Sequence, residues 1–182
     1  GKHNNWSLST NTGINLLNPG KEPEKNIRFL LVLAAIIKAV DEYQDLLRMS
    51  CASAGNDHRL GASEAPPAII SMFIGDELAD VLDSIENEVP YEKLPNLAKD
   101  TSDRNRTSPF AFTNNKFEFR MLGSSFSIAG PNIILNTIVA ESFSEFSDIL
   151  EKADNIEKAA LQIVRDTIKK HNRIIFNGNN YA

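Results

Sequence analysis

The chain has 182 residues, of which 42% are hydrophobic and 24% are charged, a profile typical of one globular domain. Nineteen basic residues against 24 acidic ones give a net charge of −5, which excludes a protein that coats polyanions, so no nucleic-acid partner is expected. The single cysteine, Cys51, excludes an internal disulfide framework and favours a reducing compartment. We therefore expect a cytoplasmic protein.

No membrane association is expected either. The longest apolar run, residues 29–37, ends at Lys38 and is far shorter than the roughly 20 residues that a membrane-spanning helix needs. The first residues are polar and do not resemble a signal peptide. Because the chain does not open with Met, we expect it to be a portion of a longer protein.

The first predicted elements are a strand and a helix. Polar and apolar residues alternate over residues 2–9, which predicts a half-buried strand with one wholly polar face. That polar face carries His3, Asn5, Ser7 and Ser9. After Pro23, apolar residues recur at helical spacing, which predicts a helix over residues 24–49 that supports the core.

A charged loop is predicted next. Residues 52–67 show neither period and mix small residues with Arg59 and Glu64. Residues 68–73 predict a strand or a short helix, and residues 76–88 have the apolar spacing of a helix. An exposed connection follows over residues 91–103.

Two aromatic runs on either side of Asn114 and Asn115 predict a β-hairpin, with the two asparagines in its turn. In the second strand, residues 116–122, apolar residues alternate with Glu118 and Arg120. A carboxylate and a guanidinium are therefore expected to point the same way from a rigid element.

Two more helices are predicted, over residues 131–152 and 155–171, and Asp154 with Glu157 resembles a capping box for the second. His171, at its end, is assigned no role. Together the elements predict an α+β fold in which an antiparallel sheet carries the site residues. The helices expected to back this sheet cover residues 24–49, 131–152 and 155–171.

Charged residues on loops and strand faces are the candidates for chemistry. The arginines of this group could pair with carboxylate or phosphate oxygens of an anionic substrate together with a transferring phosphoryl group; they are Arg59, Arg104, Arg106 and Arg120. The simpler interpretation of Arg104 is a surface residue. His3 and Glu118 could share one divalent cation, although two ligands do not complete a metal site. The simpler alternative is that Glu118 and Arg120 form a same-face ion pair and that His3 has no role.

Four segments carry a more specific signal, which comes from their joint occurrence in this order. They are residues 1–7 (GKHNNWS), 55–67 (GNDHRLGASEAPP), 105–109 (NRTSP) and 116–120 (KFEFR). Together they closely resemble glutamine synthetases, in particular the large type III form, and the resemblance covers nearly the whole chain. It implies that residues 1–182 are the C-terminal part of a catalytic domain, without its upstream metal-ligand strands and its N-terminal domain.

The resemblance implies ligands for the nucleotide and its metal. His3 and Glu118 resemble the histidine and the glutamate that bind the metal ion beside the nucleotide phosphates. Ser7 resembles a serine near the adenosine end of the nucleotide. The implied cofactors are two or more Mg²⁺ or Mn²⁺ ions in each site of the full protein, with ATP as co-substrate.

The resemblance also implies roles in catalysis. Arg59 resembles the arginine that binds the substrate glutamate, and Glu64 resembles the flap glutamate that closes the site and helps to take a proton from ammonium. Arg106 and Arg120 resemble the arginines that neutralise the transferring phosphoryl group, which makes them substrate-binding and catalytic residues.

The implied activity is the ATP-dependent ligation of ammonia to L-glutamate through γ-glutamyl phosphate, in a homo-oligomer, a dodecamer of stacked rings. This segment alone is expected to be inactive. Two alternatives are a γ-glutamyl ligase that uses another amine and a non-catalytic homologue kept for assembly. Residues 74–103 are an insertion relative to shorter forms of the family, and we expect them to serve packing or subunit contact.

Overall fold

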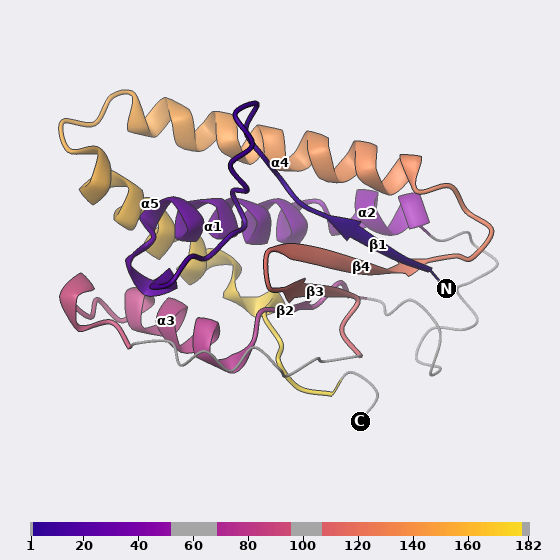
Figure 1. Ribbon diagram of the computed structural model, residues 1–182, viewed down its shortest axis with the longest axis horizontal. Coiled ribbons are helices and arrows are strands. Elements are labelled where there is room, and N and C mark those ends of the chain that lie inside the picture. Colours follow the sequence, from indigo (N-terminus) through magenta and orange to yellow (C-terminus); the bar gives the residue numbers. More distant parts are fainter. Residues whose placement is uncertain (1, 52–68, 96–106, 180–182) are drawn as a thin grey trace.

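A four-stranded sheet and helices that cover one of its faces make up the structure (Figure 1). The computed structural model describes residues 2–51, 69–95 and 107–179. In spatial order the strands are β1 (Lys2–Trp6), β4 (Lys116–Leu122), β3 (Phe110–Thr113) and β2 (Met72–Phe73).

The sheet is mixed. Strands β1 and β3 each pair antiparallel with β4, whereas β2 pairs parallel with β3. Parallel neighbours need a long crossover connection, and helix α3 (Asp76–Glu86) lies between β2 and β3 in the chain. The predicted α+β class is confirmed, but the prediction of a wholly antiparallel sheet is wrong at β2.

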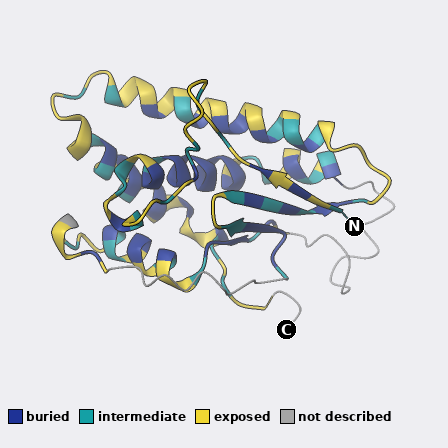
Figure 2. Cartoon of the chain, in the orientation of Figure 1, coloured by how far each residue is buried: buried dark blue, intermediate teal, exposed yellow. Residues whose placement is uncertain are grey.

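Helix α1 (Ile27–Glu42) occupies the centre of the helical part. Asn26 caps its start, because the Asn26 side chain accepts a hydrogen bond of 3.1 Å from the backbone nitrogen of Phe29. Most of α1 is buried (Figure 2), and the helix contacts α4 (Ala129–Leu150) and α5 (Ile156–His171). Over the described ranges, no helix combines the length and apolar character that crossing a bilayer would require.

The helix predicted over residues 24–49 is wrong as a single element. It divides into a 3-10 turn (Pro23–Lys25), α1, and a separate helix α2 (Gln44–Cys51). The break lies at Tyr43, whose φ and ψ are −119° and 30° and whose hydroxyl donates to Glu141 on α4. Apolar spacing continues across this point, so the periodicity could not reveal a break that involves a tertiary contact.

The remaining helices agree with the predictions to within about two residues at each end. The predicted capping box is wrong, because Asn155 and not Asp154 caps α5, accepting a hydrogen bond of 2.9 Å from the backbone nitrogen of Lys158. Helix α3 packs against α5, where Arg165 Nε donates to the carbonyl of Ile85 at 3.0 Å. The described part of the insertion therefore packs within this chain.

The strand predicted over residues 116–122 has these bounds in the structure, whereas two other predicted segments form shorter strands. The strand predicted over residues 2–9 ends at Trp6, and the segment 68–73 contributes only the two residues of β2. Of the connection over residues 91–103, the described part contains a 3-10 helix, Tyr91–Lys93. The hairpin is confirmed, with β3 and β4 joined at Asn114 and Asn115.

An aromatic cluster fixes the inner face of the sheet against α1. Phe110 stacks on Phe117 with ring centroids 4.5 Å apart, and Phe119 meets Phe110 edge-on at 5.6 Å. Phe112 contacts Phe117 within the sheet and Phe29 of α1, the latter at 5.8 Å. Burial of a phenylalanine side chain contributes roughly 1.5–3 kcal/mol, so a one-residue slip that turned this face outward would be strongly unfavourable.

Candidate functional site

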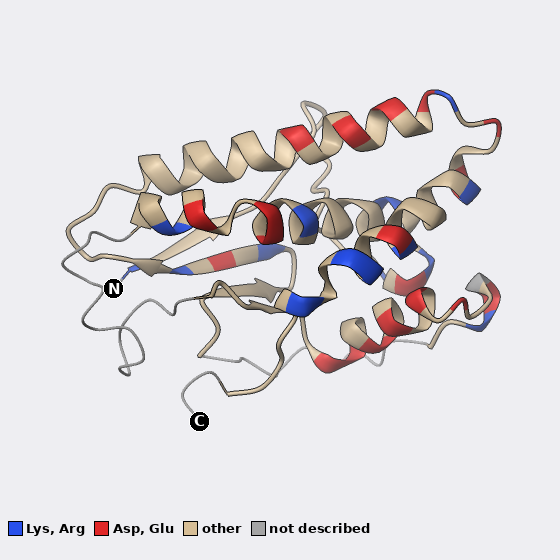
Figure 3. Ribbon diagram, turned by 180° about the vertical axis from the view of Figure 1, so that it is seen from behind, with Lys and Arg blue, Asp and Glu red and all other residues tan. Residues whose placement is uncertain are grey.

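The outer face of the sheet, opposite to the aromatic cluster, carries the polar residues of β1 and β4. His3 and Asn5 are exposed, while the residue that follows each of them is buried. Charged and apolar residues alternate along β4 (Figure 3), and this alternation places Glu118 and Arg120 on the same face. Asn5 lies directly opposite Glu118 in the strand register. The alternation of each strand thus brings these polar side chains together.

Glu118 and Arg120 form a partly buried ion pair. Nε and Nη2 of Arg120 donate to Oε2 of Glu118 at 3.1 and 2.9 Å, and Nη1 donates to the carbonyl of Ser108 at 3.4 Å. The arginine side chain is 11% exposed and the glutamate side chain 23%. Because both groups are largely shielded from water, their attraction is stronger than that of an open surface pair. The same-face ion pair, the simpler of the two interpretations, is therefore present.

His3 lies beside this pair. Its Nδ1 is 3.8 Å from Oε2 of Glu118, and its side chain is 62% exposed. Within the described residues, the contacts of the Glu118 carboxylate all use Oε2, and Oε1 makes none. An imidazole nitrogen and a carboxylate oxygen are suitable ligands for a divalent cation. Across the described parts of the chain no group of three or more His, Cys, Asp or Glu side chains is arranged to hold a metal ion, so a complete metal site needs further ligands.

The Ser7 hydroxyl takes part in contacts that join the segment after β1 to the hairpin turn. It donates to the carbonyl of Asn115 at 2.9 Å and lies 3.2 Å from Oδ1 of Asn15. Asn115 follows Asn114, whose φ of 60° is a conformation that asparagine tolerates, so the predicted turn role is confirmed. The place of Ser7 near the adenosine end of a nucleotide stays a prediction.

The other predicted site residues, Arg59, Glu64 and Arg106, lie outside the described residues. Of the four that are described, His3, Glu118 and Arg120 come together on the outer face of the sheet. Ser7 follows β1 at the end near the hairpin turn. Their proposed roles in metal, nucleotide and phosphoryl binding stay predictions.

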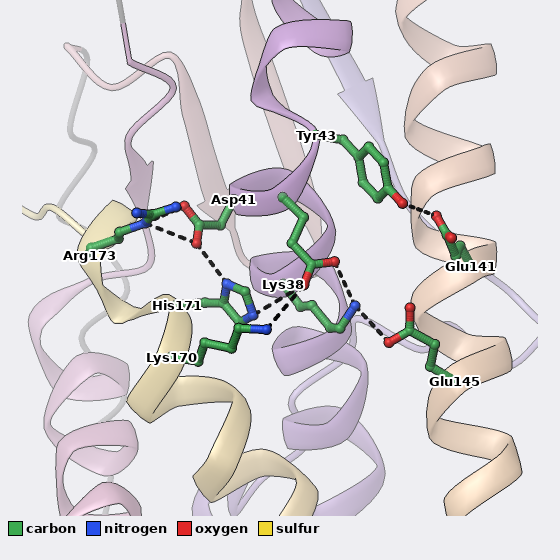
Figure 4. A network of polar contacts seen from close by, with 9 residues as sticks. Lys38, Asp41, Tyr43, Glu141, Glu145, Lys170, His171 and Arg173 are labelled. Atoms are coloured by element: carbon green, nitrogen blue, oxygen red, sulfur yellow. Dashed lines mark hydrogen bonds and ion pairs between the residues drawn. The ribbon is translucent and has the colours of Figure 1, made fainter.

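A buried polar network among the helices was missed by the sequence analysis (Figure 4). Nδ1 of His171 lies 2.7 Å from Oδ2 of Asp41, and Arg173 Nε donates to both oxygens of Asp41 at 2.9 and 3.1 Å. Asp41 follows buried Ile37 by one helical turn, and His171 follows buried Ile168 in the same way. A polar residue that continues an apolar stripe was the signal that could have indicated this pair.

Lys38 forms the second half of this network. Its Nζ is 2.7 Å from Glu42 and 2.8 Å from Glu145 of α4, and the lysine side chain is only 11% exposed. Burial lowers the pKa of Lys38, but hydrogen bonds to Glu145 and Glu42 outweigh this effect and raise the pKa above its usual value. Glu42 also lies 3.8 Å from Lys170 and 3.6 Å from His171, so the network joins α1, α4 and α5.

The chain is similar along its whole length to known glutamine synthetases. It is 52% identical to a type-3 glutamine synthetase of Dictyostelium discoideum, 48% identical to a glutamine synthetase of Butyrivibrio fibrisolvens and 45% identical to one of Bacteroides fragilis. Each match covers 100% of this chain and 27 or 28% of the relative, so the chain spans about a quarter of the length of these proteins. No family model matches the chain.

The matches, at 45–52% identity overall, cover every segment on which the resemblance was based. A match of this extent cannot come from short motifs alone, and the α+β fold is compatible with it. Over the segment that it spans, the chain is therefore homologous to glutamine synthetases.

Proposed function

We propose that the full-length protein joins ammonia to L-glutamate in an ATP-dependent reaction through γ-glutamyl phosphate, and that this chain supplies part of the site. The observation that carries the proposal is the grouping of His3, Glu118 and Arg120 on one sheet face, in a chain whose relatives are named glutamine synthetase. Because the described site holds too few metal ligands, we propose that residues 1–182 are inactive alone.

His3 and Glu118 would hold a divalent ion, Mg²⁺ or Mn²⁺. Their donor atoms lie 3.8 Å apart on neighbouring strands, and the hydrogen bonds and ion pairs of Glu118 with the described residues use Oε2 and not Oε1. A bound divalent ion supplies positive charge that neutralises phosphate oxygens during transfer. Arg120 would hold the Glu118 carboxylate in place through its two hydrogen bonds to Oε2.

The arginines and Glu64 would act on the substrates. Arg59 would bind glutamate, and Arg106 and Arg120 would place fixed positive charge where negative charge develops on the phosphoryl group. Glu64 would close the site, keep water from the acyl phosphate and accept a proton from ammonium. Ser7 would lie near the adenosine of ATP. A cytoplasmic homo-oligomer, a dodecamer of stacked rings, completes the proposal.

Substitution of Glu118 tests the metal site. In the full-length protein, Glu118→Ala should weaken Mn²⁺ binding and remove activity, because it removes one of the two metal ligands that this chain would supply. Glu118→Gln keeps the size of the side chain but removes the charge, and we expect a smaller loss of Mn²⁺ affinity. Activity and metal dependence that both survive Glu118→Ala would contradict the assignment.

Substitution of Arg120 distinguishes neutralisation of the phosphoryl group from positioning of the Glu118 carboxylate. If its guanidinium neutralises the phosphoryl group, Arg120→Gln should lower kcat by about 10²–10³ while Mn²⁺ affinity changes little. If it acts only by holding Glu118, the same change should mainly weaken Mn²⁺ binding.

Two further assays test the nucleophile and the inactivity of the fragment. Activity of the full-length protein with ammonium is compared with its activity with small amines. Residues 1–182 alone should release no phosphate from ATP in response to ammonium.

A further inference from the structure

The inner side of β1 is tied to the segment that contains α4 by side-chain hydrogen bonds. Lys2 Nζ donates to the carbonyl of Phe126 at 2.6 Å, Asn4 Nδ2 donates to Oδ1 of Asn132 at 2.6 Å, and Trp6 Nε1 donates to Oδ1 of Asn136 at 2.9 Å. Asn4 and Trp6 thus meet residues one turn apart on α4, whereas Lys2 meets a residue that precedes this helix. This pattern sets how β1 lies along α4 (Figure 1).

His3 sits where backbone pairing is irregular. Lys2 pairs with Leu122, but Asn4 pairs with Phe119, so two steps along β1 correspond to three steps along β4. An irregularity of this kind redirects side chains locally, so the alternation of β1 places His3 on the outer face but does not fix its direction within that face. Its two neighbours, Lys2 and Asn4, are the residues that are anchored to the α4 segment.

Asn4 is the more constrained of the two anchors. Its side chain belongs to a residue that is only 5% exposed, whereas the bond of Lys2 is exposed to solvent. A buried amide that loses its hydrogen-bond partner is strongly unfavourable, so the strand would shift until the amide found another partner. Such a shift would move His3, the next residue, relative to Glu118.

We propose that Asn132 is a positioning residue, which acts through Asn4 to hold His3 beside Glu118 for metal binding. This inference rests on the proposed function, because it takes His3 and Glu118 as metal ligands. Asn132 would act on the site from the opposite face of the sheet, through the strand itself. Partners that orient metal ligands commonly change metal affinity by about 10–100-fold when they are replaced.

The experiment measures Mn²⁺ binding to the full-length protein in the absence of substrates, from the electron paramagnetic resonance signal of free Mn²⁺. The thermal stability of each variant is measured in parallel. Asn132→Leu removes the acceptor and should weaken Mn²⁺ binding about tenfold. Asn132→Asp keeps an acceptor oxygen of the same shape and should restore affinity close to that of the wild type. If Asn132→Leu does not fold, Asn132→Ser, whose hydroxyl is too short to take the same bond, should show the same loss.

Asn155→Ala is the matched control. It removes the side-chain cap of α5 and so lowers stability without touching β1. We expect it to bind Mn²⁺ like the wild type. Equal losses of affinity in Asn155→Ala and Asn132→Leu would overturn the inference, because the effect would then follow stability alone.

His3→Ala distinguishes the inference from the proposed function. Weak Mn²⁺ binding in both His3→Ala and Asn132→Leu supports the metal site and the positioning role of Asn132. Weak binding in His3→Ala with wild-type binding in Asn132→Leu overturns the positioning role and leaves the metal site in place. Wild-type binding in His3→Ala overturns the metal site and the positioning role together.

Discussion

The His171 imidazole and the Asp41 carboxylate lie 2.7 Å apart, although 130 positions separate the two residues in the chain. Their side chains are 4% and 1% exposed, and they join the C-terminal ends of α5 and α1 (Figure 4). In this environment each group depends on the other, because removal of one takes away the shortest polar contact of a buried side chain.

Asp41→Ala should therefore lower the local stability of α1 and α5 by about 3 kcal/mol. Asp41→Asn should cost less, because its amide oxygen can still accept a hydrogen bond from the imidazole. Hydrogen exchange of backbone amides in α1 and α5 of the full-length protein measures this local stability. Arg173→Ala is the control: the Arg173 side chain is 74% exposed, and we expect an effect below about 1 kcal/mol.

Lys38 and Lys170 both approach Glu42 but should differ in importance. Lys38→Met leaves the Glu42 and Glu145 carboxylates without their shared cation, and we expect a loss of about 1–2 kcal/mol in local stability. Lys170 is 73% exposed and 3.8 Å from Glu42, so Lys170→Met should cost less than about 0.5 kcal/mol.

The Lys38→Met effect should also depend on pH. A raised pKa of Lys38 in the folded state means that its contribution is present at neutral pH and is lost as the pH rises through the folded pKa. The wild type should therefore lose more stability than Lys38→Met in the alkaline range above the ordinary lysine pKa. Hydrogen exchange cannot reach that range easily, so thermal unfolding across a pH series is the measurement. Parallel pH curves for the two proteins would contradict the role of this amine.

Cys51 should be unreactive in the folded protein. Burial raises the pKa of its thiol from 9.0 to about 11, so little thiolate forms at neutral pH. Between these values the unfolded chain loses the proton first, and the contribution of this group to stability therefore falls as the pH rises from 9 to 11. Site-resolved alkylation of the full-length protein should show slow labelling at pH 8 and rapid labelling at the same pH in urea. Rapid labelling without urea would contradict burial of this thiol.

Local patterns predicted the elements that carry the described part of the site. In β4 the alternation of apolar residues with Glu118 and Arg120 follows directly from the burial of one face, so both the strand and its outer residues could be predicted. The break at Tyr43 and the parallel pairing of β2 could not, because each depends on elements that are distant in the sequence. The residues that the sequence assigned to a metal and to a phosphoryl group contact each other in the structure through the Glu118–Arg120 pair.

By itself, the sequence determined the α+β class, the inner and outer faces of β1 and β4, and the similarity to glutamine synthetases. Each of these features depends on residues that are close together in the sequence, through their alternation, their helical spacing or a short motif. Only the tertiary structure decided that Asn4 meets Asn132 and that Asp41 meets His171. No local sequence pattern relates positions that are so far apart in the chain. The packing of α4 and α5 against the rest of the fold brings these side chains together, and the hydrogen bonds that they form there compensate for the burial of their polar groups.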